Sequence, residues 1–296
     1  MFNQLGVIGC GLMGGSFALA LKRAGLVRQV VGYSKSPSTT DLAKRMGVID
    51  VAAESALLAV SGSDLVLIAV PVSAIEGTLA AIRHGIKDGM LMMDVGSTKR
   101  DVVDTARRVL REQVSCFVPA HPIAGSEQSG VAHADASLYS NRQVILTPLQ
   151  QTHPELIQKA TDLWKALGSQ VLRMTPENHD AAFAAVSHLP HLLAFAYFSA
   201  IANQPAGRDY LSLAGPGFRD FTRIAASDPA IWRDILLANR EEVLKQSQRF
   251  RFALDALEHA MTAANGQALE DLIRSPAIAR SAWHIGGPAG RNPSGS

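Results

Sequence analysis

Three glycines near the N-terminus limit the folds open to this chain more than any other feature. They are Gly9, Gly11 and Gly14, whose G-x-G-x-x-G spacing follows an apolar run and opens an Ala/Leu-rich helical pattern in GVIGCGLMGGSFALALKRAG at 6–25. In this context Gly9 permits a tight turn, Gly11 lets the backbone approach a pyrophosphate, and Gly14 allows the helix to pack closely on the strand. The N-terminus of the helix adds N–H donors and a positive dipole. The stretch therefore predicts a dinucleotide site, formed by Gly9, Gly11, Leu12, Met13 and Gly14.

The first half of the chain alternates short apolar runs with helical patterns. The runs are QLGVIG at 4–9, QVVGYS at 29–34, DLVLIAVP at 64–71, MLMMDVGS at 90–97, CFVPAH at 116–121 and QVILTPL at 143–149. They are apolar throughout, as expected for strands covered on both faces. This rhythm predicts parallel strands joined by crossover helices, and it sets the glycines apart from an ordinary glycine-rich turn.

Helical periodicity replaces this rhythm from about residue 153, with one further strand expected in QVLRM at 170–174. We therefore expect an α/β fold, in which a Rossmann-type, mostly parallel sheet domain at 1–150 precedes an all-helical substrate and dimerisation domain at 151–280. Long apolar faces, such as VLKQSQRFRFALDALEHAM at 243–261, exceed what one chain buries and indicate a homodimer. Residues 281–296 are rich in Gly, Pro and Ser and are predicted to form a disordered tail.

Composition argues against several other classes of protein. No run approaches the roughly 18 apolar residues that a membrane span requires, and the N-terminus enters a strand-like run without a leader. The formal net charge of +2 does not favour nucleic-acid binding. Cys10 and Cys116 are too few for a disulfide framework, and His188 and His191 have no third metal ligand at a convincing spacing. We expect a cytoplasmic protein that binds neither a metal, nor a membrane, nor nucleic acid.

The end of the second predicted strand bears on the choice of cofactor. About 20 residues beyond the glycines, an NAD enzyme usually carries an acidic residue for the ribose hydroxyls. This chain has Ser34, followed by Lys35 and Ser36. No carboxylate there would repel a 2′-phosphate, and a cation and two hydroxyls are available to bind one. We therefore expect these three residues to favour NADP, with NAD as the alternative.

Other strand ends predict where the chemistry takes place. By analogy with this fold, Val70 and Pro71 form an apolar wall beside the nicotinamide. A nicotinamide cofactor implies hydride transfer, which calls for a general base and for groups that hold a polar substrate. His121 ends the predicted strand CFVPAH, where Pro122 stops it, and Ser97 follows the preceding strand. We expect both side chains to meet at the carboxyl edge of the sheet.

Four segments in order resemble one known family. They are GSTK at 96–99, HPIAGSEQSG at 121–130, SHLPHLLAFA at 187–196 and GFRDFTRIAASDPAIWRDI at 217–235. They resemble the prephenate/arogenate (cyclohexadienyl) dehydrogenases of tyrosine biosynthesis, and the resemblance covers almost all of residues 4–275. It implies a homodimer and an NAD(P)-dependent oxidative decarboxylation of prephenate or arogenate, in which the ring loses hydride and carbon dioxide to give a 4-hydroxyphenyl product. The motifs leave the choice between the two substrates open.

The resemblance also implies roles for individual residues. His121 matches the histidine that takes up the proton of the ring hydroxyl, and Ser97 matches the serine that contacts both groups. Arg223 matches the arginine that pairs with a substrate carboxylate, although a salt bridge to Asp220 or Asp228 is the alternative. The other matches line or flank the substrate cavity: Ser187, His191, Glu127, Arg219 and Trp232.

The chain departs from the family pattern where a run of glycines is expected, because it has Pro216 in LAGPGFRDF. Proline fixes the backbone and removes a donor, so the contacts of this loop with substrate are expected to differ. The sequence contains neither the chorismate mutase segment nor the regulatory module of some relatives. Inhibition by tyrosine, which shares the ring and side chain of the substrate, is therefore expected at the active site itself.

Two other functions remain as alternatives from the sequence. The opening glycine pattern also resembles 3-hydroxyacid dehydrogenases of the 6-phosphogluconate or hydroxyisobutyrate type. Those enzymes need a catalytic lysine in the second domain, whereas no lysine occurs between residues 176 and 240. The other alternative is a sensor that binds NADP without turnover, for which His121, Ser97 and Arg223 would be dispensable.

Overall fold

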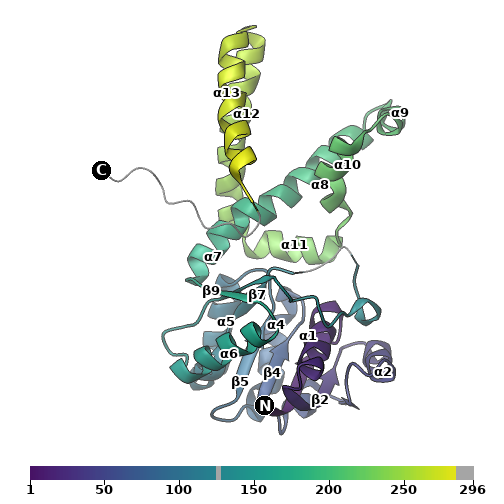
Figure 1. Cartoon of the computed structure of the whole chain (residues 1–296), viewed down its shortest axis with the longest axis vertical. Helices are drawn as coiled ribbons and strands as arrows, with labels where there is room; N and C mark the ends of the chain where they lie inside the picture. The colour runs from purple at the N-terminus through teal and green to yellow at the C-terminus, as the bar shows by residue number, and fades with distance from the viewer. Residues whose placement is uncertain (125–127, 285–296) are drawn as a thin grey trace. The chain divides into compact units, whose positions relative to one another are not determined.

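The computed structural model describes residues 1–124 and 128–284. The chain divides into two compact units, residues 1–243 and residues 244–296. The first unit contains a parallel sheet covered by helices, followed in sequence by a group of helices (Figure 1). In the second unit, every described element is helical.

A six-stranded parallel sheet lies at the centre of the first unit, with the strand order β3-β2-β1-β4-β5-β6. The order reverses between β1 and β4, and in open sheets of this kind ligands bind beyond the carboxyl ends of the strands at the reversal. The predicted Rossmann-type sheet is thus confirmed, although the two-residue β3 was not expected. The strands are β1 (Phe2–Ile8), β2 (Val27–Tyr33), β3 (Val51–Ala52), β4 (Leu65–Ile68), β5 (Leu91–Asp94) and β6 (Phe117–Val118).

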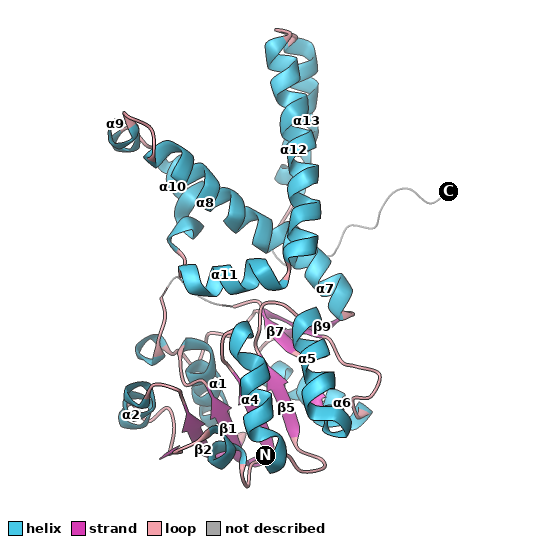
Figure 2. Ribbon diagram, turned by 180° about the vertical axis from the view of Figure 1, so that it is seen from behind, coloured by secondary structure: helices cyan, strands magenta, loops and turns pink. Residues whose placement is uncertain are grey.

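Helices cover both faces of this sheet (Figures 1 and 2). One face carries α1 (Leu12–Arg23) and α6 (Pro154–Ala166), and the other carries α4 (Ile75–Ile82) and α5 (Arg100–Leu110). Every residue of β4 and β5 is buried as a result, which explains why these strands are apolar without alternation. Two shorter helices, α2 (Pro37–Arg45) and α3 (Ala56–Val60), lie in the connections from β2 to β4.

An aromatic cluster joins α6 to the first helix. The ring of Trp164 lies 5.0 Å from that of Phe17 and 5.1 Å from that of Tyr139, measured between centroids, and all three side chains are fully buried. Burying a ring of this size contributes about 2–3 kcal/mol. Although α6 follows the domain boundary predicted at residue 150, it therefore packs with the sheet.

The predicted strand CFVPAH is not one parallel strand, because it breaks at Pro119. β6 ends at Val118, and β7 (Ala120–Pro122) belongs to a second sheet, antiparallel to β8 (Gln143–Leu146), with β9 (Gln170–Arg173) parallel to β8. Proline has no N–H for a sheet hydrogen bond, which accounts for the break. As predicted, the strand that contains His121 ends at the second proline, although Pro122 itself still pairs with Val144 as the last residue of β7. His121 thus lies in the small sheet, two residues after Pro119.

The helical part of the first unit begins with one long helix. α7 (Pro176–Phe183) continues through a π-helical turn (Ala184–His188) into α8 (Leu189–Ala202). α9 (Gly207–Ser212), α10 (Pro216–Thr222) and α11 (Pro229–Ala238) follow. Pro216, the departure from the family pattern, is the first residue of α10, a position that suits its fixed φ and missing N–H.

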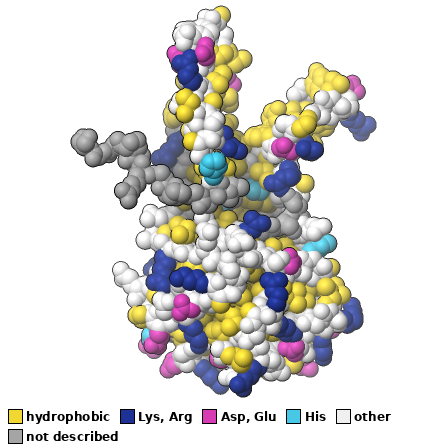
Figure 3. Space-filling model, viewed as in Figure 1, with side chains coloured by type: hydrophobic (Ala, Val, Ile, Leu, Met, Phe, Trp, Pro, Cys, Tyr) yellow, Lys and Arg dark blue, Asp and Glu magenta, His cyan; other side chains and the backbone are white. Residues whose placement is uncertain are grey.

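The long helix carries apolar surface that the chain does not cover. Residues 176–202 are long and apolar enough to cross a membrane by length and composition, with a mean hydropathy of 1.4, yet only 28% of the apolar window is buried. The same composition is found in helices at oligomer interfaces. Exposed hydrophobic side chains lie on α8 and α10 (Figure 3), including Tyr197 and Phe221, and at Leu213 between α9 and α10. We interpret this surface as one that a partner covers.

Two long helices make up the C-terminal part of the described chain. α12 (Arg240–Thr262) crosses from the first unit into the second and is followed by α13 (Gly266–Ala282). The side chain of Asn265 caps α13 by accepting a hydrogen bond from the N–H of Ala268 at 3.0 Å. α13 ends two residues inside the segment predicted as a tail, and residues 285–296 lie outside the described residues.

Candidate active site

The glycine turn after β1 leaves no room for other residues at two positions. Gly9 has a φ of +96°, and a Cβ there would lie 2.2 Å from the carbonyl oxygen of Ala69 on the neighbouring strand end. A Cβ on Gly14 would lie 2.1 Å from the carbonyl oxygen of Gly9. These two glycines therefore permit the tight turn and the close packing of α1, as the spacing predicts.

Gly11 is different, because a Cβ there would meet nothing within 4 Å. Gly11 is the N-cap of α1, no side chain caps this helix end, and its first turn contains no acidic residue. Beside it lies a cavity of about 350 Å³, which Leu12, Met13, Val70 and Pro71 also line. Open space, free N–H donors and an apolar wall together fit a nicotinamide dinucleotide, with its pyrophosphate over Gly11.

Of the three residues expected at the ribose, Ser34 bonds to the glycine turn, whereas Lys35 and Ser36 are exposed. The Ser34 hydroxyl accepts a hydrogen bond from the Cys10 N–H at 2.8 Å, which ties the end of β2 to the glycine turn. Lys35 and Ser36 are exposed, and the hydroxyls of Ser36 and Ser38 lie 2.8 Å apart. α2 starts directly after Ser36, with no acidic residue in its first turn. This end of the site therefore presents a cation, hydroxyls and helix N–H groups.

A second cavity, of about 630 Å³, lies next to the first. It is lined by six of the predicted residues: Ser97, His121, Ser187, His191, Arg223 and Trp232. Ser97, Ile231 and Ile235 line both cavities, so the two share a wall. A ring bound in the larger cavity can therefore lie against a nicotinamide bound in the smaller one.

His121 is buried and hydrogen-bonded at one ring nitrogen. Its Nδ1 lies 2.8 Å from Nε2 of His179, and its ring packs against Phe183 with centroids 4.8 Å apart. Burial, followed by the proximity of His179 and Lys99, lowers the pKa of His121 well below its usual 6.5. At neutral pH this imidazole is therefore uncharged and has one nitrogen able to accept a proton.

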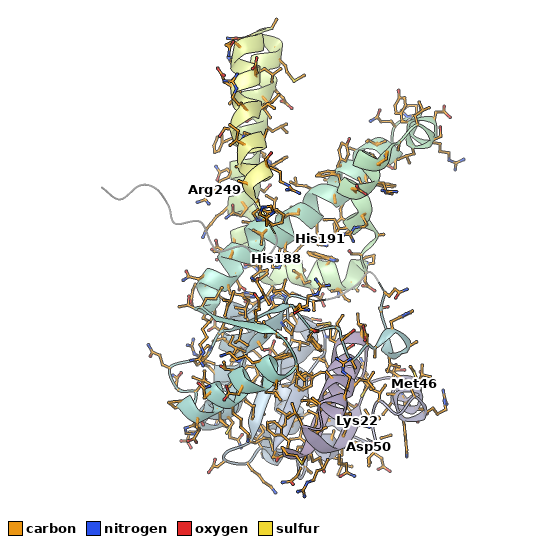
Figure 4. All side chains as sticks on the ribbon, in the orientation of Figure 1. Lys22, Met46, Asp50, His188, His191 and Arg249 are labelled. Carbon is orange, nitrogen blue, oxygen red and sulfur yellow. The ribbon has the colours of Figure 1, made fainter. Side chains whose placement is uncertain are left out.

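Two histidines on the long helix have different surroundings (Figure 4). His191 stacks on Trp232 with centroids 3.6 Å apart, and its Nδ1 donates to the Ser187 carbonyl at 2.9 Å. His188 instead lies 3.1 Å from the side-chain nitrogen of Asn239, and burial lowers the pKa of His188 to about 4. His191 thus belongs to the wall of the cavity, whereas His188 belongs to the packing beneath it.

Two guanidinium groups line the larger cavity. Arg223 was predicted from the sequence, and Arg142, just before β8, was missed. Among the described residues that line this cavity, none is acidic. The cavity is thus suited to a substrate with carboxylates.

Two predicted residues are not brought to this cavity by the described structure. The Arg219 side chain is 75% exposed, pairs with Asp220, and does not line the cavity. Glu127 lies outside the described residues. Neither assignment therefore gains support from the geometry.

Sequence reasoning missed a buried network behind His121. Asp94 forms an ion pair with Lys99 and accepts from the Ala120 N–H at 3.0 Å, and both side chains are fully buried. Asp180 accepts from the Lys99 N–H at 2.8 Å and from the Arg100 N–H at 2.9 Å. The sequence signals were the acid of LMMD before GSTK and the His-Asp pair in ENHD, but only the fold shows that they meet. This network holds the strand end, β7 and α7 together.

Sequence reasoning also missed a contact at the smaller cavity, between α11 and the turn after β4. Asp234 of α11 accepts a hydrogen bond from Ser73, which lies in the turn after β4. Asp234 and Ile231 both line the cavity beside Gly11. α11 is therefore held over the crevice at the carboxyl edge of the sheet (Figure 1).

Two family models together match most of the chain. The model for the nucleotide-binding domain of prephenate dehydrogenase matches residues 17–173. The model for the dimerization domain of prephenate dehydrogenase matches residues 175–275.

Individual relatives match over nearly the whole chain. A prephenate dehydrogenase from Bacillus subtilis is 38% identical over 280 residues, which are 93% of this chain and 73% of the relative. A cyclohexadienyl dehydrogenase from Zymomonas mobilis is 32% identical over 284 residues, with coverage of 95% and 96%. Among solved structures, prephenate dehydrogenase from A. aeolicus in complex with hydroxyphenyl propionate and NAD+ superimposes with a TM-score of 0.88 at 34% identity, covering 95% of this chain and 98% of the other.

Proposed function

Since the chain belongs to the prephenate dehydrogenase family, we propose that it catalyses the NAD(P)-dependent oxidative decarboxylation of prephenate, arogenate or both, as a step of tyrosine biosynthesis. The observation that supports this most is the wall shared by the two cavities. It brings a dinucleotide crevice against a cavity with an uncharged buried histidine and two arginines. Hydride transfer requires that juxtaposition.

His121 is the proposed general base. Its Nε2 takes the proton of the ring hydroxyl while the ring carbon loses hydride, and a nicotinamide held in the crevice would accept that hydride. Loss of the ring carboxylate as carbon dioxide then leaves an electron pair that makes the ring aromatic, and the ring oxygen recovers a proton from His121. Ser97, on the shared wall, orients the hydroxyl toward His121.

The substrate carboxylates are assigned to the arginines. Arg223 pairs with one carboxylate, and Arg142, which the sequence did not single out, is placed to meet the other. Ser187 and the stacked pair of His191 and Trp232 shape the opposite wall. Prephenate and arogenate both have two carboxylates and differ at one side-chain carbon, so steady-state kinetics with both compounds decides the substrate.

NADP is the proposed cofactor. Lys35 and Ser36 with the N-terminus of α2 offer a cation, a hydroxyl and N–H groups to a 2′-phosphate, and no acidic residue in that first turn repels it. A binding titration with NADP and NAD tests this. If NAD binds about tenfold more tightly than NADP, a difference of about 1.4 kcal/mol, NAD is the cofactor instead.

The proposed assembly is a homodimer, formed through the exposed apolar surface of the helical part. Tyrosine is proposed to inhibit by binding in the substrate cavity, so inhibition that is not competitive with substrate would contradict this. A cytoplasmic location, expected from the sequence, stays a prediction.

Replacing His121 with Asn tests the function directly. Reduced-cofactor absorbance is followed with prephenate as substrate, and the rate should fall by roughly 100-fold or more, because the general base is lost. A rate within about threefold of the original would contradict the catalytic assignment and favour the sensor that binds cofactor without turnover.

A further inference from the structure

Three side chains form a hydrogen-bonded chain that ends at His121. Asp180 Oδ1 lies 2.7 Å from Nδ1 of His179, and Nε2 of His179 lies 2.8 Å from Nδ1 of His121. Asp180 and His179 are both in α7, and both are fully buried. Because solvent does not reach these side chains, the three groups themselves determine which ring nitrogens carry protons.

The protonation state of Asp180 determines which groups donate and which accept in these hydrogen bonds. Burial alone would raise the pKa of Asp180, but hydrogen bonds from His179 and from the N–H groups of Arg100 and Lys99 hold the pKa below its usual value. The carboxylate is therefore ionised and only accepts hydrogen bonds. It follows that the proton of His179 is on Nδ1.

The position of the proton on His179 determines the position of the proton on His121. Burial lowers the pKa of His179, so its ring is uncharged and holds one proton, on Nδ1. Its Nε2 then accepts, and His121 must donate from Nδ1 across the 2.8 Å contact. His121 is uncharged as well, which leaves its Nε2 without a proton. That Nε2 has no hydrogen-bond partner among the described residues, and His121 lines the substrate cavity.

We propose that Asp180 and His179 are positioning residues that fix the tautomer of His121, so that its Nε2 is the bare nitrogen presented to the substrate hydroxyl. The inference rests on the proposed function and adds two residues to it. When Nε2 takes the proton, the Nδ1–H bond to His179 remains, and the imidazolium is stabilised by the ionised carboxylate at the end of the chain. A free histidine would divide its population between two tautomers, of which one cannot act as base.

Replacing His179 tests the relay. A phenylalanine at this position would keep a ring beside Phe183 but could not accept from His121, so His179→Phe should lower kcat by roughly 100-fold or more and change KM by less than about threefold. In His179→Gln the amide oxygen can replace Nε2 as acceptor, so this variant should recover at least about tenfold of the lost kcat. His84→Gln is the control, because this exposed ring bonds to Arg83 and lines neither cavity.

A pH profile separates this role from a structural one. The titratable groups that act on His121 are His179, Lys99 and His188. Asp180 and Asp94 act on His179 behind it. A tautomer preference does not depend on pH, so the deficit of His179→Phe should stay constant as pH rises above 7. A deficit that disappears at high pH would mean that His179 only tunes the pKa of His121, and the proposal would be wrong. A Gln variant no better than the Phe variant would also overturn it.

A spectrum of the unaltered protein tests the relay directly, because it reports which nitrogen of His121 carries the proton. In ¹⁵N-labelled histidine spectra, with the His121 signals assigned by their loss in His121→Asn, Nδ1 of His121 should carry the proton and Nε2 should not. Protonation at Nε2 instead would refute the relay. If His121→Asn keeps its activity, the proposed function fails; if it is inactive while folded His179→Phe has normal kcat, only the relay fails.

Discussion

At the scale of single residues, two arginines line the larger cavity, and the sequence predicted only one of these two. Arg223 was found because it lies in a motif, whereas Arg142 lies between strands in a stretch without a recognisable pattern. His121 and Ser97 were predicted from strand ends, yet the residues that bond to His121 were not. His179 is 58 positions from His121, and only tertiary folding brings such residues into contact. Chemistry at strand ends is predictable; the support behind it is not.

Arg142→Gln should weaken substrate binding more than catalysis. The change removes a charge from the wall of the larger cavity, where we propose that a substrate carboxylate binds, and leaves His121 in place. KM should therefore rise roughly 10- to 100-fold, equal to about 1.4–2.7 kcal/mol, while kcat changes little. Steady-state kinetics at saturating cofactor measures both. Arg107→Gln, which removes a half-exposed arginine bonded to Asp104, is the control. An unchanged KM in Arg142→Gln would remove this residue from the substrate site.

The acid limb of activity should lie well below pH 6.5. His121 acts as base only without a proton, and burial lowers its pKa, so the uncharged form persists as pH falls through 6.5. Activity is therefore complete above the lowered pKa and is lost only as pH falls through it. The profile of kcat/KM between about pH 5 and 8 measures this. A half-maximal value at pH 6.5 or above would show that burial does not set the protonation of this base.

At the scale of elements, pattern and local chemistry predicted most strands, and one proline explains the main error. Apolar runs identified β1, β2, β4 and β5, because strands covered on both faces need no polar residues. CFVPAH looked continuous, since a sequence does not reveal which sheet each half joins after Pro119. Similarly, the position of α11 depends on the hydrogen bond between Ser73 and Asp234, which are 161 positions apart in the sequence. Local rules therefore predicted the elements and not their junctions.

Two alanine substitutions should separate the two roles of the glycine turn. Gly11→Ala places its Cβ in open space with an ordinary φ of −74°, so Tm without cofactor should be unchanged while cofactor Kd rises about tenfold or more. Gly14→Ala puts its Cβ 2.1 Å from the Gly9 carbonyl oxygen, so Tm itself should fall. Thermal melting and cofactor titration on both variants check this. Equal losses of Tm would mean that Gly11 is needed for the fold and not for the pyrophosphate.

At the scale of the whole molecule, the distribution of apolar surface says more than the sequence does. Periodicity predicted a long helical region and an apolar excess, but not which side chains stay uncovered. The structure leaves Leu213 83% exposed and Phe221 52% exposed, around a long helix of which little is buried. Large exposed apolar side chains on one group of helices are typical of an interface between subunits.

Charged residues on that surface should therefore separate the subunits. In a dimer, Leu213→Glu combined with Phe221→Glu would bury carboxylates without partners, which costs several kcal/mol, so the protein should sediment at the mass of one chain, 31.5 kDa, instead of twice that mass. Met46→Glu is the matched control, because Met46 is 43% exposed but lies beside α2 in the sheet domain (Figure 4). Its sedimentation should match that of the unaltered protein. If the unaltered protein itself sediments as one chain at micromolar concentration, the exposed apolar face needs a different partner, and the homodimer would be wrong.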